Sequence, residues 1–228
     1  MHKRTYWLTA LTLLCAALAI ASAPWALNTP ALNFVFKPLT TALVIVYAWR
    51  RGQDQAVQRR WVLVGLALSA CGDVALLWPQ QGFLPGLVSF LLAHLAYLWA
   101  FTRQVRLARN ATPFVGYAIL AAAILWLLWP GVPAGLRLPV LAYVVGLGAM
   151  AAQAAVVWRR GAARGAVLGA GGALFMLSDA LLASNKFMQA LPLSSLWILA
   201  SYWLAQWCIA SWLAPSHDAR TARNPPAR

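Results

Sequence analysis

Two aspartates lie where an apolar segment of membrane length would hold them inside a lipid bilayer. Asp73 and Asp179 both fall in such segments. The other two acidic residues, Asp54 and Asp218, lie in polar stretches. An ionised aspartate at the centre of a membrane helix costs about 2.5–3.5 kcal/mol, so an acid kept there usually has a function. The alternative is that each carboxyl group only hydrogen-bonds a neighbouring helix.

Two buried carboxyl groups with a lysine and a histidine nearby can carry out acid–base hydrolysis. Burial and a neighbouring carboxylate both disfavour the ionised form, so such a pair can share one proton. One group then donates a proton and the other orients water. Which aspartate takes which role stays open.

Other chemistries lack their residues. There is no GxSxG elbow and no phosphate-binding glycine loop. His94 is the only histidine in an apolar segment, and Cys15, Cys71 and Cys208 form no CxxC pair. We therefore expect neither a metal site nor a cofactor.

The composition is that of an integral membrane protein. Of the 228 residues, 62% are apolar and 13 are tryptophan. A net charge of +14 could suit nucleic acid, but the lysines and arginines form short clusters between apolar segments. Cytoplasmic loops of membrane proteins have this pattern. The expected partner is thus the lipid bilayer and not nucleic acid. The Ala- and Arg-rich composition favours a bacterial cytoplasmic membrane.

Eight apolar segments predict an all-α bundle of eight transmembrane helices, because each can cross about 30 Å of hydrocarbon. They cover residues 7–23, 31–49, 61–78, 83–101, 113–129, 138–158, 165–184 and 193–213. Basic and nearly uncharged connections alternate, which predicts that both termini are cytoplasmic. One transmembrane domain, 1–214, would precede a disordered cytoplasmic tail, 215–228.

The first apolar segment has an alternative interpretation as a cleaved signal peptide. It has a basic start and a small-residue site at Ala21-Ser22-Ala23. Pro24 would directly follow the cut, and its rigid ring should fit a peptidase poorly. We therefore expect an uncleaved first helix.

This topology places several polar residues at a similar depth. Asp73 and Asp179 lie about 18 and 21 Å from the cytoplasmic edge, in the outer half of the bilayer. Lys37 lies about 9 Å below the outer edge. Gly165, Gly169, Gly172, Met176 and Asp179 recur at helical spacing, so Asp179 should face a neighbouring helix.

We predict a polar pocket between helices 31–49, 61–78, 83–101, 165–184 and 193–213. Besides the two aspartates and Lys37, its candidate substrate-binding or supporting residues are His94, Tyr97, Asn185, Lys186, Tyr202 and Gln206. Tyr202 and Gln206 could instead serve only as hydrogen bonds between helices. The Lys37 side chain could instead extend to the lipid headgroups.

Five short motifs follow one another from the second predicted helix to the last. They are Lys37-Pro38-Leu39-Thr40, Leu68-Ser69-Ala70-Cys71-Gly72-Asp73, Phe90-Leu91-Leu92-Ala93-His94-Leu95-Ala96-Tyr97, Leu177-Ser178-Asp179 and Tyr202-Trp203-Leu204-Ala205-Gln206. In this order they resemble the YhhN family of integral membrane proteins, whose characterised members are lysoplasmalogenases.

The resemblance implies hydrolysis of the vinyl ether bond of a lysophospholipid, a lysoplasmalogen. The products would be a fatty aldehyde and glycerophosphoethanolamine or glycerophosphocholine. The family's two acids correspond to Asp73 and Asp179, and Lys37, His94, Tyr97 and Asn185 match polar positions around them. Lys37 or Lys186 would hold the lipid phosphate, since both lie toward the outer headgroups.

Two other functions use the same acids. An intramembrane aspartyl protease needs one aspartate on each of two helices, although the order of the motifs fits it less well. A proton-coupled or lipid transporter could use the carboxyl groups to carry protons. No inverted repeat or pair of half-helices is visible in the sequence to favour transport.

Overall fold

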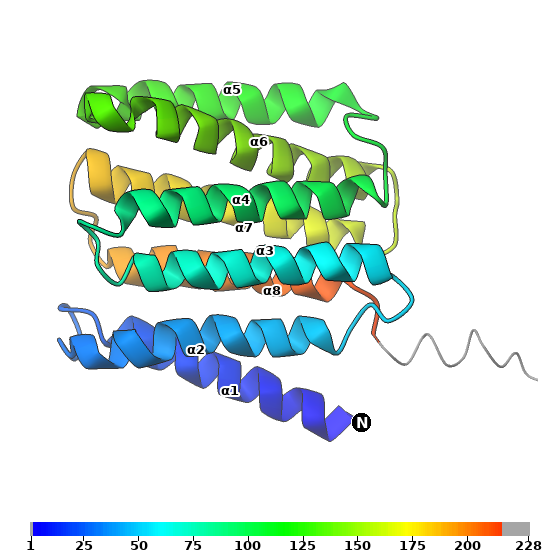
Figure 1. Ribbon diagram of the computed structural model, residues 1–228, viewed down its shortest axis with the longest axis horizontal. Helices are drawn as coiled ribbons and strands as arrows, with labels where there is room; N and C mark the ends of the chain where they lie inside the picture. The colour runs from blue at the N-terminus through cyan, green and yellow to red at the C-terminus, as the bar shows by residue number, and fades with distance from the viewer. Residues whose placement is uncertain (1, 216–228) are drawn as a thin grey trace, which may run out of the picture.

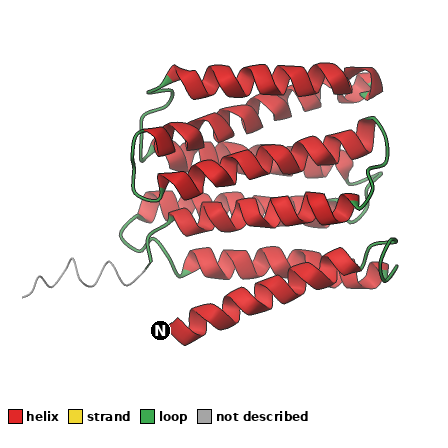
Figure 2. Ribbon diagram, turned by 180° about the vertical axis from the view of Figure 1, so that it is seen from behind, coloured by secondary structure: helices red, strands yellow, loops and turns green. Residues whose placement is uncertain are grey.

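The computed structural model describes residues 2–215, and over this range it consists of helices and their connections (Figure 2). Its eight α-helices are α1 (His2–Ala21), α2 (Pro30–Trp49), α3 (Ala56–Ala75), α4 (Phe83–Thr102), α5 (Ala111–Leu128), α6 (Arg137–Arg159), α7 (Gly165–Phe187) and α8 (Ser194–Trp212). Two short 3-10 turns, η1 (Trp129–Gly131) and η2 (Ala134–Leu136), join α5 to α6. The prediction of an all-α fold is confirmed, and each predicted apolar segment corresponds to one helix.

Six helices form a closed ring around the centre of the bundle. Going round it, α2 packs on α3, α3 on α4, α4 on α6, α6 on α7, α7 on α8, and α8 again on α2. The remaining two lie outside the ring at opposite edges, α1 against α2 and α5 against α6 (Figure 1). Side chains that point inward from any ring helix can therefore meet in one place.

Glycines bring neighbouring ring helices close together on both helices that carry the aspartates. A Cβ atom at Gly72 would lie 2.5 Å from the Phe90 ring, so α3 and α4 touch next to Asp73 only because this side chain is absent. On α7, a Cβ at Gly172 would lie 3.1 Å from the backbone of Ala151 on α6. Small residues at such contacts are typical of membrane helices.

Five helices of the described range are long and apolar enough to cross a membrane. They are α2, α4, α5 with η1, η2 with α6, and α7, whereas α1 contributes a shorter apolar stretch, Tyr6–Ala21. The chain is thus an integral, multi-pass membrane protein. That α1, α3 and α8 also span, and that the termini are cytoplasmic, stay predictions.

Several predicted boundaries were wrong. Helix α3 begins at Ala56 and not at 61, because the polar residues Gln58, Arg59 and Arg60 continue the helix although they interrupt the apolar pattern. It also ends at Ala75, three residues before the predicted end. Helix α7 runs to Phe187 and not to 184, so Asn185 and Lys186 belong to its last turn.

The arginine-rich connections gather at one end of the bundle. The α2–α3, α4–α5 and α6–α7 connections lie at the end where α1 begins (Figure 1). Arg51 fastens the end of α8 there, since its guanidinium donates hydrogen bonds to the carbonyls of Leu213 (2.9 Å) and Ser211 (3.0 Å). The predicted tail, 215–228, lies outside the described residues except for Pro215, which pairs with Arg51.

Candidate active site

Asp73 is held at the centre of the ring by groups from α2 and α8. Its Oδ2 accepts hydrogen bonds from the hydroxyls of Thr41 (2.6 Å) and Tyr202 (2.8 Å). The ammonium group of Lys37 lies 3.8 Å from Oδ1. Only 1% of Asp73 is exposed. Donors and a cation of this kind stabilise a buried carboxylate, which would otherwise be costly.

Lys37 is buried and directed inward. It is 7% exposed, and its charge faces the Asp73 carboxylate. The alternative interpretation, in which Lys37 extends to the headgroups, is therefore wrong. Thr41, one turn further along α2, also accepts a hydrogen bond from the indole of Trp203 at 3.2 Å, which fixes the hydroxyl that reaches Asp73.

Asp179 has a different environment, formed by α4 and α6. Its Oδ2 accepts a 2.5 Å hydrogen bond from the hydroxyl of Tyr143, and Nε2 of His94 lies 3.9 Å from the same oxygen. The His94 ring packs edge-on against Phe175, with centroids 4.7 Å apart. Neither of its ring nitrogens has a hydrogen-bond partner among the described residues.

Both aspartates line one cavity of about 260 Å³, which we call the polar cavity. Its polar wall residues are Asn33, Lys37, Asp73, Ser178, Asp179, Asn185, Lys186, Ser194, Ser195 and Tyr202. They come from the start of α2, the end of α3, the end of α7 and the start of α8. The cavity thus lies toward the end of the bundle opposite the arginine-rich connections (Figure 1).

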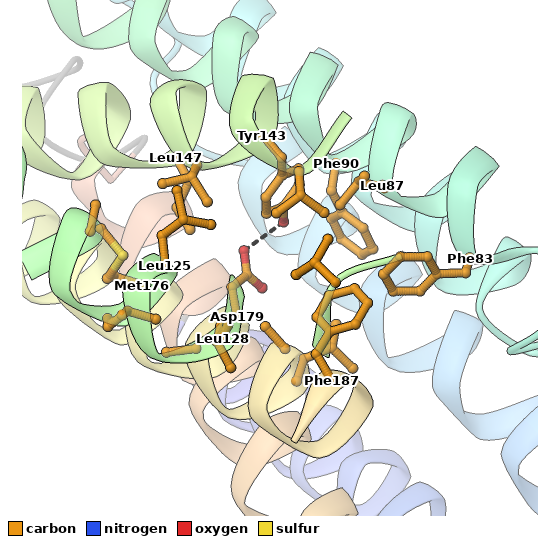
Figure 3. A pocket seen from close by; sticks show the side chains of 18 of the residues that line it. Phe83, Leu87, Phe90, Leu125, Leu128, Tyr143, Leu147, Met176, Asp179 and Phe187 are labelled. Carbon is orange, nitrogen blue, oxygen red and sulfur yellow. Dashed lines mark hydrogen bonds between the residues drawn. The ribbon is translucent and has the colours of Figure 1, made fainter. Parts of the chain in front are cut away.

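A second cavity, of about 80 Å³, adjoins it and has an almost entirely apolar lining. This apolar cavity lies between α4, α5, α6 and α7, with side chains such as Leu87, Leu125, Leu147 and Met176 on its wall (Figure 3). Asp179 is its one acidic residue and points into it, bonded to Tyr143 (Figure 3). Five residues line both cavities: Leu76, Phe83, Phe90, Asp179 and Leu182.

The structure brings six of the nine predicted site residues to the polar cavity. These are Lys37, Asp73, Asp179, Asn185, Lys186 and Tyr202. His94 lies behind Asp179 and does not line the cavity. Tyr97 and Gln206 are also absent from its wall: both are fully buried, and the Tyr97 hydroxyl donates to Oε1 of Gln206 at 2.7 Å. This hydrogen bond links α4 to α8 in the packed interior of the bundle.

The last turn of α7 contributes two polar side chains with different roles. Asn185 closes the following turn, since its Oδ1 accepts a hydrogen bond from the backbone N–H of Leu191 at 2.9 Å. Lys186 is exposed, and its ammonium group donates to the carbonyl of Pro79 at 3.2 Å. Within residues 2–215, no three His, Cys, Asp or Glu side chains gather as a metal-binding group would require.

The family model that matches this chain covers every helix that contributes to the site. The match to the YhhN family extends over residues 32–213, from α2 to α8. The chain belongs to the YhhN family. Helix α1, which lies outside the ring, also lies outside the match.

Curated relatives of this YhhN protein carry the name lysoplasmalogenase. "Lysoplasmalogenase TMEM86B" of Sus scrofa is 41% identical over 144 residues, which make up 62% of this chain and 58% of the relative. "Lysoplasmalogenase TMEM86A" of Homo sapiens is 36% identical over 65% of this chain and 63% of the relative.

A bacterial relative has the same name. "Lysoplasmalogenase" of Mycobacterium tuberculosis is 33% identical over 63% of this chain and 58% of its own length. The YhhN chain thus covers less than two thirds of the length of these relatives. No solved structure matches it.

Sequence reasoning missed Tyr143, which makes the shortest contact to either aspartate. It is the only tyrosine of α6, and it shares a face with Val140, Leu147 and Met150 at helical spacing. A single hydroxyl on an apolar inward face was the available signal. The sequence did not indicate which helix that face would meet.

Proposed function

We propose that this YhhN protein hydrolyses the vinyl ether bond of lysoplasmalogens, releasing a fatty aldehyde and glycerophosphoethanolamine or glycerophosphocholine. The observation that carries the proposal is the junction of the polar and apolar cavities at Asp179. A lysoplasmalogen has a polar headgroup and an apolar chain joined at the vinyl ether. The two adjoining cavities match these two parts, and the names of the relatives point to the same reaction.

The cavities also divide the roles of the two aspartates. A vinyl ether is opened by protonation of its β-carbon, which is the carbon on the chain side. Asp179 lines both cavities and so can reach that carbon, whereas Asp73 lines only the polar cavity. The Tyr143 hydroxyl occupies Oδ2 of Asp179, which leaves Oδ1 to carry the proton. In this proposal Asp179 is the general acid.

In this proposal Asp73 is the carboxylate that stabilises the positive charge of the oxocarbenium intermediate. When Asp179 gives its proton, the electrons of the C=C bond form the new C–H bond and leave an oxocarbenium ion. Water adds to the cationic carbon and Asp73 takes a proton from it, giving a hemiacetal. The hemiacetal hydroxyl then returns a proton to Asp179, the C–O bond to glycerol breaks, and Asp73 protonates the glycerol oxygen. Both carboxyl groups are thereby restored.

The buried groups around Asp73 act as positioning residues in this scheme. Lys37, Thr41 and Tyr202 orient the Asp73 carboxyl group and stabilise its ionised form before it takes the proton. His94, whose Nε2 lies 3.9 Å from Oδ2 of Asp179, is fully buried and packs behind that acid. The cavity is proposed to lie in the outer half of the bilayer, because the arginine-rich connections at the other end favour the cytoplasmic side.

Purified protein in detergent tests the proposal in one assay. Incubation with a lysoplasmalogen in D2O should release the fatty aldehyde with one deuterium on the carbon next to the carbonyl. The alkyl ether lysophospholipid of the same length has no C=C bond to protonate and should remain intact. Absence of aldehyde, with uptake of the same lipid into proteoliposomes, would favour a transporter.

A further inference from the structure

The polar cavity contains two lysines, and only one of them has its charge neutralised. Lys37 lies 3.8 Å from Oδ1 of Asp73 and is almost fully buried. A phosphate bound to Lys37 would compete directly with this carboxylate and deprive it of its cation. Lys37 therefore serves as the counter-ion of Asp73 and is unsuited to bind a second anion.

Lys186 has no such partner. Its ammonium group contacts the carbonyl oxygen of Pro79 at 3.2 Å and the face of the Phe83 ring at 5.0 Å. Both contacts orient the side chain, but neither carries a full negative charge. Among the described residues, no carboxylate forms an ion pair with Lys186. The result is an exposed, uncompensated positive charge on the wall of the polar cavity.

A second feature of the same cavity also favours an anion. Helix α8 begins at Ser194, and Ser194 and Ser195 both line the polar cavity. The N-terminus of a helix has a partial positive charge, which stabilises a negatively charged group nearby.

We infer that Lys186 binds the phosphate of the substrate at the mouth of the polar cavity. The protein would then select alkenyl ethers that carry a phosphodiester over neutral alkenylglycerols. The order along the cavities matches the order in the lipid. Lys186 is exposed and holds the phosphate, the two aspartates reach the ether, and the apolar cavity receives the hydrocarbon chain. The inference rests on the proposed function for the identity of the lipid.

Binding of lipids that cannot be cleaved tests this inference separately from catalysis. The probes are a 1-O-alkyl-glycero-3-phosphocholine and the 1-O-alkylglycerol of the same chain length, titrated into purified full-length protein in detergent. Lys186→Gln should weaken binding of the phospholipid roughly tenfold, the effect of losing one charged contact at a partly exposed site. Binding of the neutral lipid should not change. Lys186→Arg should keep the phospholipid affinity, since a guanidinium also binds phosphate.

Arg137 provides the matched control. It is exposed at the same end of the bundle, its guanidinium lies 5.2 Å from the ring of Trp129, and it lines neither cavity. Arg137→Gln removes one positive charge from this end without touching the site. It should leave the affinity for both lipids unchanged, which separates local binding of phosphate from general attraction of an anionic ligand.

Three results would overturn the inference: equal phospholipid affinity in Lys186→Gln and the unaltered protein, equal weakening of both lipids, or an equal loss in Arg137→Gln. Inorganic phosphate provides a further arm. Inorganic phosphate could compete with the phospholipid at a concentration similar to that of the phospholipid itself. If this competition is lost in Lys186→Gln, the site binds a free anion and not a headgroup. Binding that depends on Lys186 without aldehyde release from lysoplasmalogens would refute the proposed function and leave the phosphate site standing.

Discussion

Tyr143 donates a 2.5 Å hydrogen bond to Oδ2 of Asp179, and this phenol is the only described side chain with a hydrogen bond to that carboxyl group. Asp73, in contrast, has two hydroxyl donors and a lysine. The two acids of one cavity are thus held in unequal surroundings. In the proposed mechanism this inequality separates the acid from the carboxylate that assists water, and it can be tested residue by residue.

Asp73→Asn and Asp179→Asn should each abolish aldehyde release from a lysoplasmalogen. An amide can neither give the proton to the vinyl ether nor take one from water, and general acid–base groups contribute roughly 10²–10⁴-fold to a rate. Asp54→Asn is the control, because Asp54 is exposed in the α2–α3 connection at the opposite end of the bundle. Gel filtration and thermal unfolding should show that all three variants fold. Full turnover by either active-site variant would remove the two-aspartate mechanism.

Deuterium exchange should distinguish the two roles. In D2O, Asp73→Asn still has the acid Asp179, so an oxocarbenium ion that is not captured by water can return to the substrate. The recovered lysoplasmalogen should then contain deuterium on its β-carbon. Asp179→Asn has lost the donor and should return unlabelled substrate. Mass spectrometry of the recovered lipid gives the answer, and label found only with Asp179→Asn would mean that the roles are exchanged.

Tyr202→Phe should lower kcat roughly tenfold or more, since a hydrogen bond to a charged group is worth about 1.5–3 kcal/mol. The change removes one of the two hydroxyls bonded to Asp73 and leaves the ring packed edge-on against Phe90. Tyr47→Phe is the matched control, because the Tyr47 hydroxyl pairs with Ser211 outside both cavities. A Tyr202→Phe enzyme as fast as the Tyr47→Phe enzyme would show that this hydrogen bond has no role in the reaction.

Ala121→Phe should raise KM for long-chain lysoplasmalogens more than for short-chain ones. Ala121 is buried on the wall of the apolar cavity of about 80 Å³, and an added ring would fill part of that space. The neighbouring residue Ala122 on the same helix is exposed, so Ala122→Phe adds the same ring outside the cavity. Steady-state kinetics across a series of chain lengths compares the two. An equal change in KM in both variants would mean that the hydrocarbon chain of the substrate binds outside the apolar cavity.

The helices were predictable because each crosses the bundle as one apolar segment of membrane length. The inward direction of Asp179 could also be inferred, since the glycines on its face of α7 require a close neighbour. The start of α3 was not predictable from apolar length, because Arg59 and Arg60 extend the helix beyond its apolar part.

The partners of the polar residues were harder to predict than their faces. Tyr97 and Tyr202 look alike in the sequence, yet one bonds Gln206 in the packed interior and the other reaches Asp73 at the cavity. Helical spacing gives the direction of a side chain but not the residue that the facing helix presents at that level.

The hydrogen bond between Asp73 and Tyr202 joins residues 129 positions apart, on the third helix and the last. During synthesis, Asp73 is made long before the ribosome has produced its partner. The proposed catalytic centre is therefore incomplete until α8 has been synthesised and packs in the bundle, where Arg51 holds its end. A chain that stops before α8 is expected to release no aldehyde from a lysoplasmalogen.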